Sequence, residues 1–146
     1  MDRVIPAGFT LIELLVTLAI VGILGSFAWP SYVDHVRRSR IAEGTGQLAT
    51  LRIAMEQYYQ DYRNYGDASS TACGMAMPAA GQFSYSCTTS SNAQAFTIVA
   101  SGGSGTSVAG LRYQLDHAGL RRTTALPPGW GAVPQDCWIA SRGGTC

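Results

Sequence analysis

The stretch "GFTLIELLVTLAIVGIL", residues 8–24, decides the fold, because it opens an apolar run that continues to Trp29 with Glu13 as its only charge. At a rise of 1.5 Å per residue, the run from Phe9 to Trp29 is about 31 Å long as a helix, which matches the hydrocarbon thickness of a bilayer. An ionised carboxylate at Glu13 would cost a few kcal/mol in lipid. The run therefore predicts a membrane-spanning helix with one charge that needs a partner.

Residues 1–8, MDRVIPAG, precede this run and are too short for a secretory signal peptide. In a secretory signal the apolar region comes before the cleavage site, whereas here the small residue Gly8 comes before the apolar run. Cleavage after Gly8 would leave the run on the mature chain. We therefore expect residues 1–8 to be a leader peptide and residues 9–36 to be an anchor.

The helical pattern continues beyond Pro30. Proline removes a backbone hydrogen bond and clashes with the preceding turn, so we predict one long helix from about Phe9 to about Tyr62 with a kink near Pro30. Its first half is apolar all round, and its second half is amphipathic and needs a surface that covers its apolar stripe. The stripe follows steps of three and four residues through Val33, Arg37, Ile41, Gly44, Leu48, Leu51, Met55, Tyr58 and Tyr62.

Period-two runs after the helix predict strands of an antiparallel sheet: "FSYSC" (83–87), "AFTIVAS" (95–101) and "LRYQLD" (111–116). The segment "DHAGLR" (116–121) has the aspartate and glycine chemistry of a tight turn between two strands. The last stretch is rich in proline and glycine and is expected to be irregular. We therefore expect residues 37–146 to form an α+β head, in which the second half of the helix lies on a small sheet.

The cysteines predict two disulfides and an oxidising compartment, because their even number falls in a small domain with a thin core. There are four of them, Cys73, Cys87, Cys137 and Cys146. Local loops favour Cys73 with Cys87 and Cys137 with Cys146, but three pairings are open. The spacing lacks the CxxC pairs and nearby histidines of a zinc site. Disulfides form outside the cytoplasm, so they place the head there. The arginines at 37–40 lie on the head side of the span, where the positive-inside tendency would favour the cytoplasm, but the cysteines decide the orientation.

The composition and the histidines point away from catalysis. Only 13% of residues are charged, all basic residues are arginines, and the net charge of +1 gives no global attraction to nucleic acid. His35 and His117 have no Cys or Ser nucleophile arranged with them, and no acid pair or phosphate-binding glycine loop is evident. We expect a protein that is not an enzyme and that uses no cofactor or metal.

The amino-terminal features together resemble the class III signal of type IV prepilins. These features are the short leader, Gly8, the aromatic Phe9, the carboxylate of Glu13 five positions into the mature chain, and the unbroken apolar run. The resemblance continues through Pro30, where these pilins carry a helix kink, and reaches "CWIASRGGTC" (137–146). It implies a pilin fold, and within the family the chain looks most like the short minor pilins of the PilE type.

The resemblance implies roles for individual residues. Gly8 would be the residue after which a membrane-embedded prepilin peptidase cuts, and Phe9 would become an N-methylated amino terminus. Glu13 would pair with the amino terminus of a neighbouring subunit, and Pro30 would mark where the helix bends or melts during packing. Physical reasoning agrees for Glu13, because a carboxylate in lipid is stabilised when a neighbouring ammonium becomes its ion-pair partner.

The function that this resemblance implies is that of a structural, minor subunit of a type IV pilus, supporting motility, adhesion or DNA uptake. The subunit would sit in the bacterial inner membrane with its head in the periplasm, and an assembly platform would then pack it with other pilins into an extracellular pilus. A major pilin and a pseudopilin of type II secretion are the alternatives. Two head disulfides, with no clustered acidic calcium loop, argue mildly against a major pseudopilin.

A DNA-receptor pilin is the alternative from another class of function. Arginines and aromatic rings on one surface would contact the DNA backbone and stack on bases. In the competing interpretation, the arginines flank a solvated turn and the tryptophans pack under the disulfide loop. The deciding feature is whether these residues share one exposed face. The candidates are Arg112, Arg121, Arg122 and Trp130, with Arg142, His117 and Trp138 around them.

Overall fold

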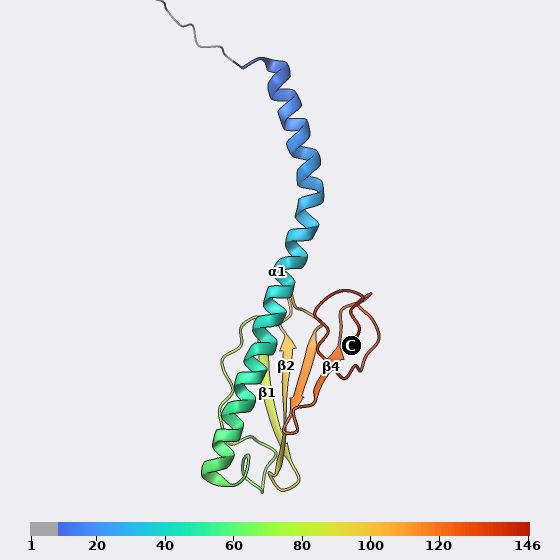
Figure 1. The fold of residues 1–146 in the computed structure, drawn as a ribbon. Coiled ribbons are helices and arrows are strands. Elements are labelled where there is room, and N and C mark those ends of the chain that lie inside the picture. Colours follow the sequence, from blue (N-terminus) through green and yellow to red (C-terminus); the bar gives the residue numbers. More distant parts are fainter. Residues whose placement is uncertain (1–8) are drawn as a thin grey trace, which may run out of the picture. The chain divides into compact units, whose positions relative to one another are not determined.

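One long helix and four strands make up the computed structural model, which describes residues 9–146 (Figure 1). The leader 1–8, with the expected cleavage site at Gly8, lies outside the described residues. The chain divides into two units, Met1–His35 and Val36–Cys146. The elements are α1 (Leu11–Tyr62), β1 (Phe83–Ser90), β2 (Ala95–Gly102), β3 (Arg112–Asp116) and β4 (Arg121–Ala125).

The first part of α1 begins at a capping threonine. The Thr10 hydroxyl accepts a hydrogen bond from the Glu13 backbone N–H at 3.3 Å, which satisfies a donor of the first turn. The apolar side chains that follow are exposed in the single chain, and the helix is long and apolar enough to cross a membrane. Pro30 lies inside α1 and does not end it. The prediction of one continuous helix is confirmed, whereas a bend at Pro30 stays a prediction.

The sheet is an antiparallel meander in the order β1-β2-β3-β4. The turn predicted at "DHAGLR" joins β3 to β4. There the Leu120 N–H donates to the Asp116 carboxylate at 2.8 Å, and Gly119 has a φ of +84°. The sequence predicted only three strands and missed β4, because "RRTTA" is polar and shows no apolar alternation.

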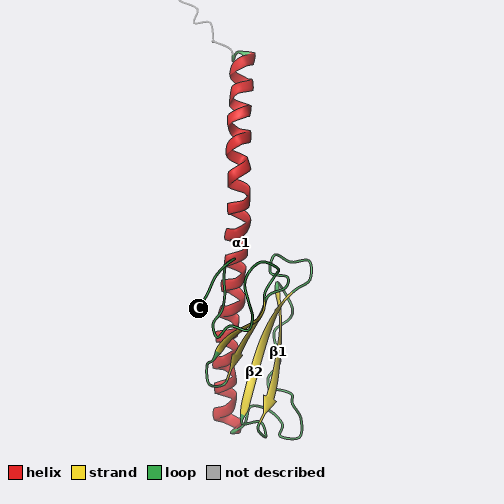
Figure 2. Cartoon of the chain, turned by 90° about the vertical axis from the view of Figure 1, so that its right-hand side faces the viewer, coloured by secondary structure: helices red, strands yellow, loops and turns green. Residues whose placement is uncertain are grey.

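The core lies between the second part of α1 and one face of the sheet, as the views in Figures 1 and 2 show for the head. Gly44 permits α1 to approach β1 closely, because a Cβ at this position would collide with the ring of Phe83. The predicted apolar stripe is confirmed through the middle of the helix, whereas Tyr62 at its end is 61% exposed. The buried residues of the stripe are Ile41, Gly44, Leu48, Leu51 and Met55.

One disulfide fastens an irregular segment to the sheet, and the other closes a loop within the carboxyl-terminal segment. Cys73 pairs with Cys87, so the segment after α1 is tied to β1, and Cys137 pairs with Cys146 near the end of the chain. Of the three pairings left open by the sequence, the structure forms the two local loops. The buried Tyr113 hydroxyl adds a further anchor, because it donates to the Ile139 backbone oxygen at 2.6 Å. The carboxyl-terminal segment therefore packs as part of the head.

Candidate functional site

The residues expected to act in processing and assembly lie at the start of the described chain. Phe9 is 86% exposed, and Glu13 is in the first turn of α1 with the exposed side chains of Ile12 and Leu14 on either side. Both side chains are exposed in the single chain. N-methylation of Phe9 and pairing of Glu13 with a neighbouring amino terminus stay predictions.

The arginines expected to form one basic surface lie on two faces of the sheet. Arg121 is in register with the buried Leu115, and Arg122 is in register with Gln114. Because successive side chains in a strand point to opposite faces, Arg121 faces the α1 side and Arg122 faces the outer side with Arg112. Arg122 is also engaged, since its Nε lies 2.9 Å from the Asp136 carboxylate. The structure therefore does not gather these arginines into one patch.

The two tryptophans of the carboxyl-terminal segment differ in accessibility. Trp130 is only 3% exposed and lies under the Arg37 guanidinium, which is 5.5 Å from the ring centroid. The same guanidinium group is held by a 2.8 Å hydrogen bond from Arg37 Nε to the Ser107 backbone oxygen. Trp130 thus packs in the core and offers no free ring face. Trp138 is only half-buried, and its Nε1 donates to the Gln114 backbone oxygen at 3.1 Å.

A groove beside α1 brings together a basic and aromatic set that the sequence did not predict as a unit. The Arg121 guanidinium lies 4.9 Å from the Trp138 ring centroid, and Arg38 lines the groove from α1. Within residues 9–146, neither Arg38 nor Arg121 forms an ion pair. We call this cavity of about 350 Å³ the basic groove. Its lining residues are Arg38, Ile41, Ala42, Thr45, Arg121, Cys137, Trp138 and Ala140.

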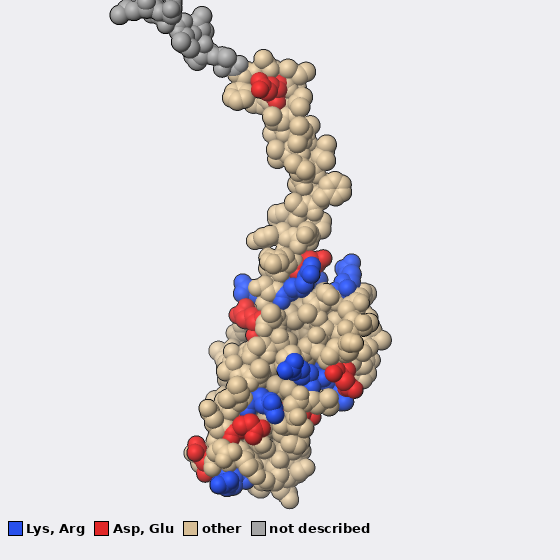
Figure 3. All heavy atoms as spheres, in the orientation of Figure 1, with Lys and Arg blue, Asp and Glu red and all other residues tan. Residues whose placement is uncertain are grey.

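Charge over the rest of the head is mixed. On the face shown in Figure 3, basic and acidic side chains of the head alternate and do not separate into fields of one sign. Across the part of the chain that the structure describes, no three His, Cys, Asp or Glu side chains cluster as metal ligands would. The basic groove, with two arginines beside a tryptophan, suits an anionic partner with an apolar or aromatic part.

An apolar amino-terminal helix that continues into a disulfide-bonded α+β head is the architecture of a type IV pilin. A family model described as "Prokaryotic N-terminal methylation motif" matches residues 6–29. A second, described as "Type IV minor pilin ComP, DNA uptake sequence receptor", matches residues 30–109, more than half of the chain. The chain belongs to the type IV pilins, in the family that this second model describes, and it is a structural pilin and not an enzyme.

Curated relatives match about half of the chain. The type IV major fimbrial protein FimA of Dichelobacter nodosus is 43% identical over 68 residues, which are 47% of this chain and 42% of that protein. The fimbrial protein EcpC of Eikenella corrodens is 36% identical over 83 residues, or 57% of this chain and 54% of that protein. The chain thus spans about half the length of these relatives. A solved type IV pilin from Shewanella oneidensis has a TM-score of 0.48 and 22% identity, covering 58% of this chain and 89% of its own.

Proposed function

We propose that the chain is a minor subunit of a type IV pilus that is cleaved after Gly8 and N-methylated at Phe9. The observation that carries the proposal is the methylation-motif match over residues 6–29, which includes the first part of α1, where the apolar side chains are exposed. Such a helix satisfies its backbone hydrogen bonds internally in a bilayer, and in a bundle of like helices its neighbours would cover its apolar side chains. Before assembly the subunit would be anchored in the inner membrane with its head in the periplasm. The assembly platform would then move it into the filament.

Glu13 provides the specific contact in this proposal. Cleavage after Gly8 creates an ammonium group at Phe9, and a neighbouring subunit can present that group to the Glu13 carboxylate. A buried carboxylate without a partner is costly, whereas a close ammonium favours its charged form. The pair therefore favours one axial register between neighbouring helices and makes cleavage a requirement for assembly.

Glu13→Ala tests this contact, and Thr17→Ala in the next turn of α1 is its matched control. We expect both variants to be processed and inserted in the membrane, and only Glu13→Ala to be strongly depleted from filaments sheared off the cell surface. The measurement is the ratio of filament to membrane protein by quantitative mass spectrometry. Normal incorporation of Glu13→Ala would eliminate the proposed role. The same spectra give the ratio of this chain to the other pilins, which separates a minor from a major subunit or a pseudopilin.

DNA binding by the head is a second candidate function, and it is favoured by the family match over residues 30–109 together with the basic groove. Arg38 and Arg121 offer two cations without ion-pair partners in the described chain, which suits contacts to the phosphate backbone. Trp138 offers a half-buried ring beside Arg121, which suits stacking on a base. The groove thereby supplies the chemistry that was expected of Arg122 and Trp130.

Salt-dependent binding of duplex and single-stranded DNA to the full chain in phosphatidylcholine nanodiscs tests this candidate. We expect Arg38→Gln and Arg121→Gln each to weaken binding and to reduce the slope of log K against log salt by about 0.7–0.9. Arg63→Gln, an exposed arginine at the other end of α1, should leave the slope unchanged. Binding that is absent at low salt, or that both groove variants retain in full, would contradict DNA binding by this groove.

Deleting the chain from cells distinguishes the biological roles. Surface pilus number, twitching motility, adhesion and natural transformation would be measured in parallel. Loss of them all would support a role in pilus assembly, because each depends on filaments. Loss of transformation alone, with normal pilus number, would support DNA uptake as the specific role.

A further inference from the structure

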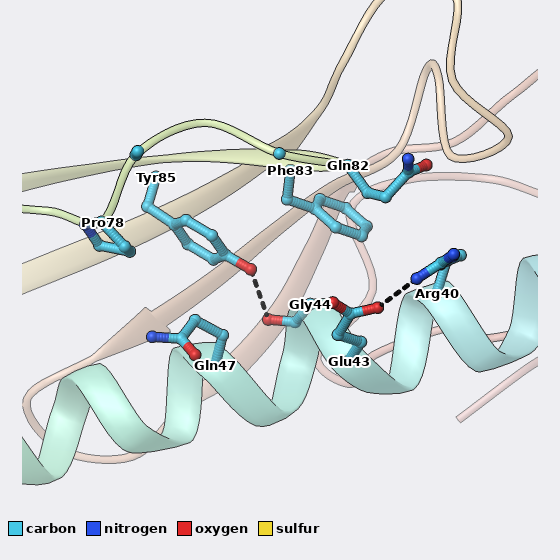
Figure 4. Close-up of a pocket in the computed structure, with 10 residues that line it drawn as sticks. Arg40, Glu43, Gly44, Gln47, Pro78, Gln82, Phe83 and Tyr85 are labelled. Atoms are coloured by element: carbon cyan, nitrogen blue, oxygen red, sulfur yellow. Dashed lines mark hydrogen bonds and ion pairs between the residues drawn. The ribbon is translucent and has the colours of Figure 1, made fainter.

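A second pocket lies between α1 and the segment that leads into β1 (Figure 4). Its volume is about 220 Å³, and it shares no residue with the basic groove. Drug-sized ligands occupy pockets of about 300–1,000 Å³, so this pocket suits one small ring. We call it the helix–loop pocket. Its lining residues are Arg40, Glu43, Gly44 and Gln47 from α1, then Pro78, Ala79, Gly81, Gln82, Phe83 and Tyr85.

Two aromatic rings give the pocket an apolar wall. The absence of a side chain at Gly44 lets the ring of Phe83 rest against the helix, and the Tyr85 hydroxyl donates to the Gly44 backbone oxygen at 3.4 Å. Burial, with a contribution from the negative charge of Glu43, raises the pKa of Tyr85 above its ordinary value. The phenol therefore stays protonated, and Pro78 adds a further apolar surface beside it in Figure 4.

The polar groups around this wall are neutral in sum. Arg40 and Glu43 form an ion pair with a 2.9 Å separation between Nη1 and Oε2, so their charges cancel. Gln47 and Gln82 line the pocket on opposite sides of Phe83 in Figure 4, and their side-chain amides make no hydrogen bond to any of residues 9–146. Each amide offers two N–H donors and one carbonyl acceptor to a ligand.

The geometry points to a binding site for one uncharged sugar ring of a glycan. A sugar hydroxyl both donates and accepts, as the two free amides do, while the C–H face of the ring can pack on Tyr85 and Pro78. An uncharged ligand fits because the carboxylate of Glu43 offsets the attraction of Arg40 for an anion. The pocket shares no residue with the basic groove and does not include Glu13, so the sugar-binding, DNA-binding and assembly proposals are tested independently.

Saturation-transfer NMR on the full chain in phosphatidylcholine nanodiscs tests the proposal, since nanodiscs avoid detergents with sugar headgroups. The probes are glucose, galactose, mannose, N-acetylglucosamine and N-acetylgalactosamine, with adenosine and thymidine as flat, nitrogen-rich alternatives. We expect transfer to the ring protons of at least one sugar and none to the nucleosides. If none of the five sugars shows saturation transfer, the proposal is overturned. Transfer to a nucleoside without transfer to any sugar would also overturn it.

Paired variants assign the signal to this pocket. Gln47→Met with Gln82→Met keeps the side-chain length and removes both amides, so the Kd of the bound sugar should rise roughly tenfold or more. Gln57→Met, an exposed glutamine on the same helix, should leave the Kd unchanged. Circular dichroism checks that the paired variant is folded. A folded paired variant that binds the sugar as tightly as the wild type would refute the assignment.

Discussion

Tyr113 of β3 holds the carboxyl-terminal segment on the sheet, and Tyr113→Phe isolates the contribution of one hydrogen bond. The side chain is 0% exposed, and its hydroxyl lies 2.6 Å from the Ile139 backbone oxygen. Burial raises the pKa of Tyr113, so the hydroxyl remains a donor at any physiological pH. The substitution keeps the ring but leaves the buried Ile139 carbonyl oxygen without a hydrogen-bond donor, which costs about 1–3 kcal/mol. We expect the free energy of unfolding to fall by that amount.

Urea unfolding of the full chain in micelles, followed by the near-ultraviolet circular dichroism of the tryptophans, measures this change at constant m-value. Thr123→Val should act on the same segment, because the Thr123 hydroxyl donates to the Cys137 oxygen at 2.6 Å and accepts from the Ile139 N–H at 3.1 Å. Since both substitutions release one segment, the double variant should lose less than the sum of the single losses.

Tyr62→Phe is the control for Tyr113→Phe, because Tyr62 is largely exposed and its substitution should change stability by less than about 0.5 kcal/mol. Two results would refute the reasoning. One is a Tyr113→Phe variant as stable as this control. The other is strict additivity with Thr123→Val, which would mean that the two hydroxyls do not anchor a common segment.

Three further predictions concern the packing, the loop closure and the acid stability of the head. Gly44→Ala should cost about 1–3 kcal/mol by overpacking against Phe83, and urea unfolding would show it, with Phe83→Leu recovering part of the loss. Cys137→Ala with Cys146→Ala should cost roughly 3 kcal/mol by opening a short loop, and reductant should then change the melting temperature less than it does in the wild type. The Ser69 backbone N–H lowers the pKa of Asp67, so the ionised carboxylate favours the folded state above its unfolded pKa, and this contribution is lost as the pH falls through the folded pKa. Asp67→Asn should therefore flatten the acid side of a plot of melting temperature against pH, and an unchanged slope there would contradict the assignment.

The long helix could be predicted because both of its halves carry strong patterns. The first half is an apolar run long enough to predict a membrane-spanning or buried helix. The second half repeats apolar residues at helical spacing from Ile41 to Met55. Pro30 gave the opposite local signal, but helical segments on both sides continue through it. Strand β4 could not be predicted in the same way, because its partners supply the apolar contacts that its own sequence lacks.

Because the sequence did not predict β4, Arg121 and Arg122 were expected to lie on one surface. Arg121 and Arg122 look like one cluster as neighbours in a turn, but as neighbours in a strand they must separate to opposite faces. Both tryptophans carry a guanidinium over the ring, Arg37 on Trp130 and Arg121 on Trp138, but only Trp130 is buried in the core, where Arg37 reaches it from far away in the sequence. Local sequence carries no signal of that contact, so only the tertiary structure could identify Trp138 as the accessible ring.

The division of the chain at Val36 has a practical consequence for preparing a water-soluble head. A fragment that begins at Val36 omits the apolar span and keeps Arg37, whose guanidinium group ties α1 to Ser107 and Trp130. A fragment that begins at Ala42 loses this tie and also Ile41, which is 1% exposed in the core. We therefore expect the longer fragment to crystallise or give dispersed NMR spectra, and the shorter one to be less stable and to aggregate more readily, because it lacks Ile41 and the Arg37 contacts.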